Sequence, residues 1–120
     1  MAYITDSSVE GRNGIIVVDL GTGESWRHLD GHPSVRPQQQ WLGYQWGVPL
    51  YANNVGRPFG YNSFGADGIA LSADGETLFW KAVGGRYLYS IPTVRCTLLY
   101  RSEIRLRHQL GASPRQQRDV

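Results

Sequence analysis

The sequence has one cysteine, one lysine and no long apolar run. Cys96 cannot form a disulfide within the chain, so cysteine content leaves the cellular compartment undecided. No apolar stretch approaches the roughly 20 residues that a membrane-spanning helix needs, so no membrane span is expected. The first ten residues, MAYITDSSVE, lack the basic and apolar segments of a secretory signal peptide. An N-glycosylation acceptor is also missing, which removes one indication of secretion without excluding it.

Common catalytic motifs are missing as well. The sequence has no P-loop, nucleophile elbow, CxxC motif or Ser-His-Asp arrangement. His28 and His32 are four residues apart, a spacing that brings side chains together on a helix. Because they flank the end of an expected strand, we do not predict a zinc pair. Cys96 is expected to be an inert thiol. Whether the chain takes part in an enzyme stays open, but we do not expect these 120 residues to be active alone.

The net charge of +2 hides an uneven distribution. Residues 1–94 carry six basic and eight acidic side chains, whereas residues 95–120 carry six arginines and two acids. Fourteen of the fifteen glycines also precede residue 95. We therefore predict one domain over residues 1–94 and a divergent basic tail over residues 95–120, irregular or weakly helical and partly disordered. The tail has only one aromatic residue, Tyr100, among its six arginines, so no nucleic-acid partner is predicted.

Two groups of short segments rich in β-forming residues predict an all-β fold. The first group covers residues 2–6, 14–20 and 24–29, and the second covers residues 68–72, 77–82 and 86–91. Strands of five or six residues with a turn about every ten are typical of antiparallel meanders in sandwiches, barrels and propellers. The run GIIVVDL at residues 14–20 is expected to be a strand buried on both faces.

A long connection, residues 30–65, separates the two groups. It is rich in Gly, Pro, Gln and Asn, yet it also contains seven aromatic residues. Connections of this length inside a domain are usually functional or disordered, and we expect short ladders such as GVPLY within it. Its side chains could line an apolar pocket for a small amine or ring compound, or pack over the ends of the meanders. The candidate ligand-binding residues here are Trp41, Tyr44, Trp46 and Asn53.

The order of motifs resembles the major royal jelly protein/yellow family in its bacterial and fungal form. The motifs are Y-I-T-D-S, I-I-V-V-D-L, S-W-R, H-P-S, D-G-I-A-L-S and L-Y-S-I-P-T, spread over residues 2–93. The resemblance implies a six-bladed, gluconolactonase-like β-propeller in which each blade is a four-stranded meander. This chain would then be a fragment with about two antiparallel blades of six, a partial β-propeller. Family members are typically extracellular, and some are related to L-dopachrome tautomerase.

The resemblance also implies a ligand-binding rim. In a blade, the start of the first strand, the end of the second and the connection between blades share one end. Asp67 starts such a first strand, and Asp6 and Ser7 end a second. Gluconolactonase-like propellers place an acid or amide at the Asp67 position as one ligand of a divalent cation such as Ca²⁺. Alternatively, Asp67 caps its own turn, and Asp6 and Ser7 only begin one. One carboxylate is not a metal site, so no cofactor is expected for this chain alone.

Three interpretations of function follow. The first is a propeller fragment whose full-length relatives bind small molecules at the propeller face. The second is a metal-dependent enzyme of the lactonase or tautomerase type, and the third is a truncated product without autonomous function. Missing neighbouring blades would leave apolar faces uncovered, so we predict self-association through exposed blade faces. The positions expected on such faces include Ile69, Leu71, Leu78, Trp80, Leu88 and Ser90.

Overall fold

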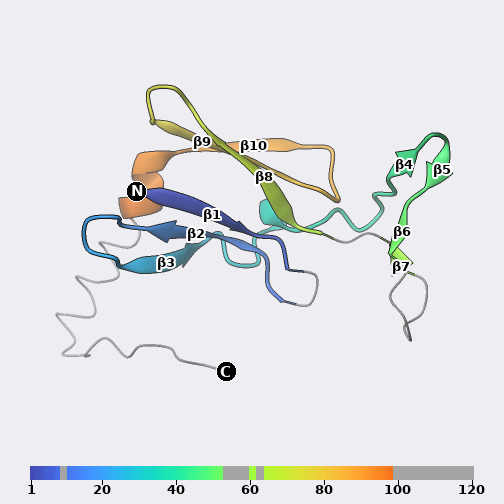
Figure 1. The fold of residues 1–120 in the computed structure, drawn as a ribbon, viewed down its shortest axis with the longest axis horizontal. Helices are drawn as coiled ribbons and strands as arrows, with labels where there is room; N and C mark the ends of the chain where they lie inside the picture. Colours follow the sequence, from blue (N-terminus) through green and yellow to red (C-terminus); the bar gives the residue numbers. More distant parts are fainter. Residues whose placement is uncertain (9–10, 53–59, 62–63, 99–120) are drawn as a thin grey trace.

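The structure is a computed structural model that describes residues 1–8, 11–52, 60–61 and 64–98. Within these residues the fold is all-β, as predicted: two three-stranded antiparallel sheets, two two-stranded ladders, a 3-10 turn and one short helical segment (Figure 1). The expected disorder in the last residues of the tail, and the candidate ligand-binding residue Asn53, lie outside the described residues.

The first sheet is a meander of β1 (Ala2–Asp6), β2 (Gly14–Val18) and β3 (Ser25–His28), in that order. Neighbouring strands are antiparallel throughout. The turn between β2 and β3 closes with the Asp19 amide donating to the Glu24 carbonyl at 2.8 Å. These three strands confirm the first predicted group to within two residues at each end.

The second sheet is a meander of β8 (Ala66–Leu71), β9 (Thr77–Ala82) and β10 (Leu88–Pro92), with β9 in the centre. The turn between β8 and β9 places Gly75 at a φ of 77°, a conformation that glycine adopts without steric cost. The sequence GETLFWKA therefore forms a turn and a strand where the glycine and the β-forming run predicted them.

The two meanders share one hydrophobic core. Ile15 and Val17 from β2 and Leu78 and Trp80 from β9 belong to one buried cluster. Val35 joins the cluster from the 3-10 turn η1 (Pro33–Val35). The Trp80 indole also donates a 3.1 Å hydrogen bond to the Ser34 carbonyl, so its polar nitrogen stays satisfied inside the core. The inner faces of the two sheets are therefore buried against each other.

The burial of β2 differs from the sequence expectation. Ile15 and Val17 are fully buried, whereas Ile16 and Val18 on the other face are only half-buried. Side chains of a strand alternate between two faces, and here only one face meets the second sheet. The prediction from the continuous apolar run, a strand buried on both faces, was therefore wrong for one of the two faces.

The expected set of exposed positions on the second sheet mixed two faces and was wrong in part: Leu71, Leu88 and Ser90 are exposed, but Leu78 and Trp80 are not. Leu78 and Trp80 are almost fully buried, at 1% and 4% exposure. The register pairs Tyr89 with Trp80, so Tyr89 shares the inner face and its ring stacks on the indole with centroids 5.9 Å apart. Leu88 lies on the opposite face, where 68% of it is exposed.

A short helical segment, residues 93–98, continues the core past the change in composition at residue 94. Cys96 in this segment is fully buried in the core cluster. The Trp26 indole donates to the Cys96 carbonyl at 3.0 Å and ties the segment to β3. Burial raises the pKa of the Cys96 thiol, which disfavours the reactive thiolate.

The connection between the sheets forms an arm. β4 (Tyr44–Gln45) pairs with β5 (Val48–Pro49), and β6 (Tyr51–Ala52) pairs with β7 (Gly60–Tyr61). Figure 1 shows these two ladders extending away from the two sheets. The short ladder expected around GVPLY is therefore present, and we call β4 to β7 the arm.

Candidate functional site

The end of β1 lies beside the start of β8. The Thr5 hydroxyl donates a 3.1 Å hydrogen bond to the Asp67 carbonyl, although 62 residues separate them. Asp6 at the end of β1 and Asp67 in β8 therefore lie at the same end of the two sheets. We call this end, where the β1–β2 loop, the loop after β3 and the start of β8 meet, the rim.

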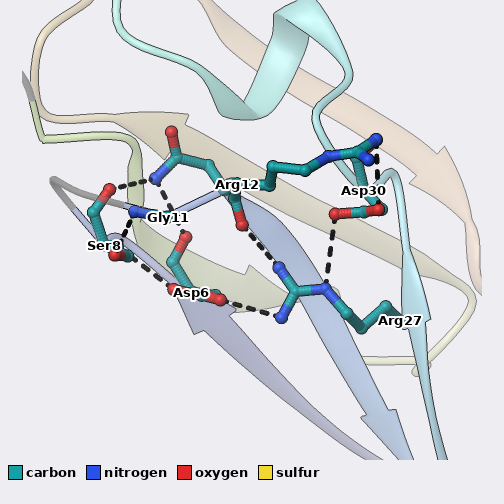
Figure 2. A network of polar contacts seen from close by, with 7 residues as sticks. Asp6, Ser8, Gly11, Arg12, Arg27 and Asp30 are labelled. Atoms are coloured by element: carbon teal, nitrogen blue, oxygen red, sulfur yellow. Dashed lines mark hydrogen bonds and ion pairs between the residues drawn. The ribbon is translucent and has the colours of Figure 1, made fainter. Parts of the chain in front are cut away.

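Asp6 is engaged by groups of the chain itself. Its Oδ2 accepts from Arg27 Nη1 at 2.8 Å, and its Oδ1 accepts from the Ser8 amide at 3.1 Å (Figure 2). The hydrogen bond from Arg27 favours the carboxylate and holds the pKa of Asp6 below its usual value. The same contact raises the pKa of Arg27. Both oxygens of this candidate ligand-binding residue thus stabilise the rim loops, and Ser7 beside it is half-buried.

Arg27 also connects the two loops that follow β1 and β3. Its Nη2 donates to the Arg12 carbonyl at 2.6 Å, and its Nε lies 3.4 Å from Asp30 Oδ1. The second Asp30 oxygen lies 3.2 Å from Arg12 Nη2, which extends the network by one more guanidinium. Figure 2 shows this chain of alternating charges running across the rim. No sequence motif indicated this network, and the one hint was an arginine on the outward face of β3.

A buried amide supports the same loops from below. Asn13 is only 6% exposed, and its Nδ2 donates to the carbonyls of Ser8 and Asp6 at 2.8 and 3.3 Å. Gly65 lies directly against it. A Cβ added at Gly65 would come within 2.6 Å of the Val35 carbonyl oxygen and still closer to the Asn13 side chain. Only glycine fits there, so the connection that leads into β8 packs directly against Asn13 and the Val35 carbonyl.

Asp67 lies at a β-bulge. The register between β8 and β9 shifts between Ala66 and Gly68, which leaves Asp67 without a cross-strand partner. Its side chain is exposed, and its carboxylate has no hydrogen-bond or ion-pair partner among the described residues. In the described part of the chain, no three His, Cys, Asp or Glu side chains group closely enough to hold a metal ion.

The aromatic candidates do not gather at the rim. Trp41 is half-buried with its ring beside Gly43, where an added Cβ would approach the ring to 2.7 Å. Tyr44 and Trp46 lie on the β4–β5 hairpin of the arm and are 63% and 94% exposed. The structure therefore separates the aromatic candidates of the arm from the acids of the rim (Figure 1).

The two histidines have different surroundings. His28 is buried, and its Nε2 has no hydrogen-bond partner among the described residues. Burial, and to a lesser extent repulsion from His32, lower the pKa of His28. His32 is exposed, and its Nδ1 caps the 3-10 turn by accepting from the Ser34 amide at 3.2 Å. The same nitrogen lies 2.9 Å from the Ser34 hydroxyl.

A pocket that the sequence did not indicate opens beside the charged network. Its volume is about 340 Å³, and it is lined by Gly11, Arg12, Asn13, Gly31 and Arg36. Two guanidinium groups thus border one small polar cavity. The signal in the sequence was weak because Arg12 and Arg36 are 24 residues apart and belong to different loops.

The sequence matches no protein-family model and no curated protein. The described residues contain no helix with the length and apolar character needed to cross a membrane.

Proposed function

We propose that the two meanders are parts of neighbouring blades of a β-propeller of the yellow/major royal jelly type, and that the rim binds a small molecule. The observation that carries this proposal is the hydrogen bond between Thr5 and the Asp67 carbonyl, which joins the end of one meander to the start of the next. The order of strands in each meander and the order of motifs along the sequence support it.

The ligand proposed for the rim is a small organic amine. Asp6 is neutralised by Arg27, whereas the carboxylate of Asp67 is exposed and has no partner among the described residues. An exposed carboxylate at a bulge can accept hydrogen bonds from an ammonium group, because bulges re-aim a side chain away from the ladder. Asp67 is therefore the residue to which we assign ligand contact.

Titration of the isotope-labelled chain with tyramine, followed by amide NMR at constant ionic strength, tests this assignment. We expect saturable shifts at Thr5, Asp67 and Gly68. Asp67→Asn should weaken binding about tenfold, because a hydrogen bond to a charged group is replaced by a neutral one. Glu24→Gln removes the same charge from the turn at the opposite end and should change nothing. Equal affinities in the wild type and Asp67→Asn would refute the role of Asp67.

The proposal also includes self-association. A propeller covers both faces of each four-stranded blade with neighbouring blades and leaves only short, protected edges. Here β10 pairs only with β9 in the described part of the chain, and Leu88 on its outer face is exposed. A second copy of the chain is the partner we propose for this edge.

A further inference from the structure

We infer that the rim pocket binds an oxyanion group, a carboxylate or a phosphate, of a small molecule between Arg12 and Arg36. The inference concerns different side chains from the amine site proposed at Asp67, and it holds whether or not the chain belongs to a propeller. Four features of the pocket lead to it: its backbone floor, the weak pairing of its arginines, its charge and its volume.

Gly31 forms an open backbone floor under one guanidinium. It has a φ of 65°, and a Cβ added to it would lie 3.2 Å from both Nε and Nη2 of Arg12. The Arg12 side chain therefore lies across the backbone of the loop after β3. A larger residue at position 31 would be strained and would push the guanidinium away.

The arginines of the network differ in how firmly they are held. Arg27 makes two short hydrogen bonds, of 2.8 Å to Asp6 and 2.6 Å to the Arg12 carbonyl, as expected for strong charge-assisted contacts. Arg12 reaches Asp30 only at 3.2 and 3.4 Å, and its side chain is 74% exposed. Arg36 is exposed, and its side chain has no partner among the described residues. Arg12 and Arg36 therefore retain free donors toward the pocket.

The local charge favours an anion. The network and the pocket together hold three guanidiniums, on Arg12, Arg27 and Arg36, and two carboxylates, on Asp6 and Asp30. Asp6 is committed to Arg27, and Asp30 is shared between Arg27 and Arg12. Among the described residues, one positive charge is thus left in excess at the pocket. A cation in the pocket would be repelled by the guanidiniums of Arg12 and Arg36, whereas an anion could pair with both.

The volume limits the size of the ligand. A cavity of about 340 Å³ is at the lower end of the range typical of small-molecule sites, roughly 300–1,000 Å³. Guanidinium groups present paired N–H donors that match the oxygens of a carboxylate or a phosphate. A small organic acid or a phosphate ester fits both the chemistry and the space.

Amide and arginine Nε NMR of the full chain tests the inference, with inorganic phosphate and malonate as separate probes at constant ionic strength and pH 7.5. We expect saturable shifts at Gly11, Asn13, Gly31 and Arg12 Nε. Arg36→Gln should weaken binding about tenfold, the effect of losing one hydrogen bond to a charged group. The Arg36 side chain is exposed and makes no hydrogen bond or ion pair with the described residues, so this variant should keep the fold. Arg95→Gln, an exposed arginine on the helical segment, is the matched control and should bind as the wild type does.

The two probes distinguish the classes of ligand. Binding of phosphate alone assigns a phosphate ester, binding of malonate alone assigns a carboxylic acid, and binding of both supports a general oxyanion site, provided that Arg36→Gln weakens it. Shifts that do not saturate, or equal affinity in the wild type and Arg36→Gln, would overturn the inference. Because tyramine carries no anionic group, failure here leaves the test at Asp67 unaffected.

Discussion

At the residue scale, Arg27 organises the rim more than the residues that the sequence singled out. It joins the end of β1, the β1–β2 loop and the loop after β3 through Asp6, Arg12 and Asp30. Its side chain is 39% exposed, so solvent weakens its ion pairs, and the short hydrogen bond to the Arg12 carbonyl is the contact least affected. A sequence shows an arginine on the outward face of a strand but not which distant oxygens it will meet.

His28 predicts a pH-dependent stability. Its folded-state pKa is lowered by burial, so the unfolded chain takes up a proton at a higher pH than the folded chain does. The stability contributed by neutral His28 is therefore fully present above the unfolded-state histidine pKa of about 6.5. It is lost as the pH drops from there toward the lower folded-state pKa. We expect urea unfolding at pH 5.5 to show lower stability than at pH 7.5, with a slope no steeper than about 1.4 kcal/mol per pH unit.

Two variants separate His28 from other titrating groups. His28→Leu removes the imidazole and should abolish most of the pH dependence between 5.5 and 7.5. His32→Asn removes the exposed imidazole but keeps a side chain able to cap the 3-10 turn, and it should retain the dependence. An unchanged slope in His28→Leu would mean that another group is responsible.

At the element scale, the strands were predictable and their orientation was not. Turn residues and alternating β-forming runs located all six strands of the two sheets, because both signals are local. The residues on the inner face of β10 were predicted wrongly. Leu88 and Ile91 are both apolar, and only the register against β9 determines which of them faces the core. The pocket was missed for the same reason: it depends on which loops meet after folding. Asp6 and Asp67 do lie at one end, as the resemblance to a propeller implied, because strand direction within each meander and the packing of one meander on the next together decide which ends meet.

The β4–β5 hairpin carries an unusual turn. Its two central residues, Trp46 and Gly47, have φ angles of 54° and 77°, the combination of positive values found in type I′ turns. Asparagine is preferred at the first position, whereas a bulky residue there is strained. We therefore expect Trp46→Asn to stabilise the hairpin by about 0.5–1 kcal/mol. The measurement is hydrogen exchange at the Leu50 amide, which donates to the Gly43 carbonyl at 2.7 Å.

Protection of Leu50 should rise about two- to fivefold in Trp46→Asn, which corresponds to that gain in free energy. Trp46→Ala is the control, because alanine also lacks the ring but has no preference for a positive φ. Faster exchange in Trp46→Asn than in the wild type would show that the exposed indole itself stabilises the hairpin.

At the scale of the whole molecule, one core joins two sheets, and within the described residues the outer edge of β10 pairs with no other strand. The Thr93 amide donates to the Glu76 carbonyl at 2.8 Å, one step beyond the β9–β10 register. Since backbone groups alternate in direction along an antiparallel strand, the Leu88 and Ser90 amides point away from β9. Pro92 has the same direction and lacks an N–H, which fits an edge strand. In the part of the chain that the structure describes, the outer edge of β10 thus offers two amide donors without a strand partner, next to an exposed leucine.

We predict that this edge makes the chain self-associate, and that Leu88→Lys weakens the association. An inserted lysine at an edge opposes pairing because two copies would bring like charges together, and it also removes exposed apolar surface. Sedimentation velocity over a range of protein concentrations measures the effect, with the wild type shifting to larger species as concentration rises. Leu20→Lys is the matched control: Leu20 is 71% exposed but lies in the turn after β2 rather than on an edge, so this variant should associate as the wild type does. A wild type that sediments as a monomer at every concentration, or equal dissociation by Leu88→Lys and Leu20→Lys, would contradict association through β10.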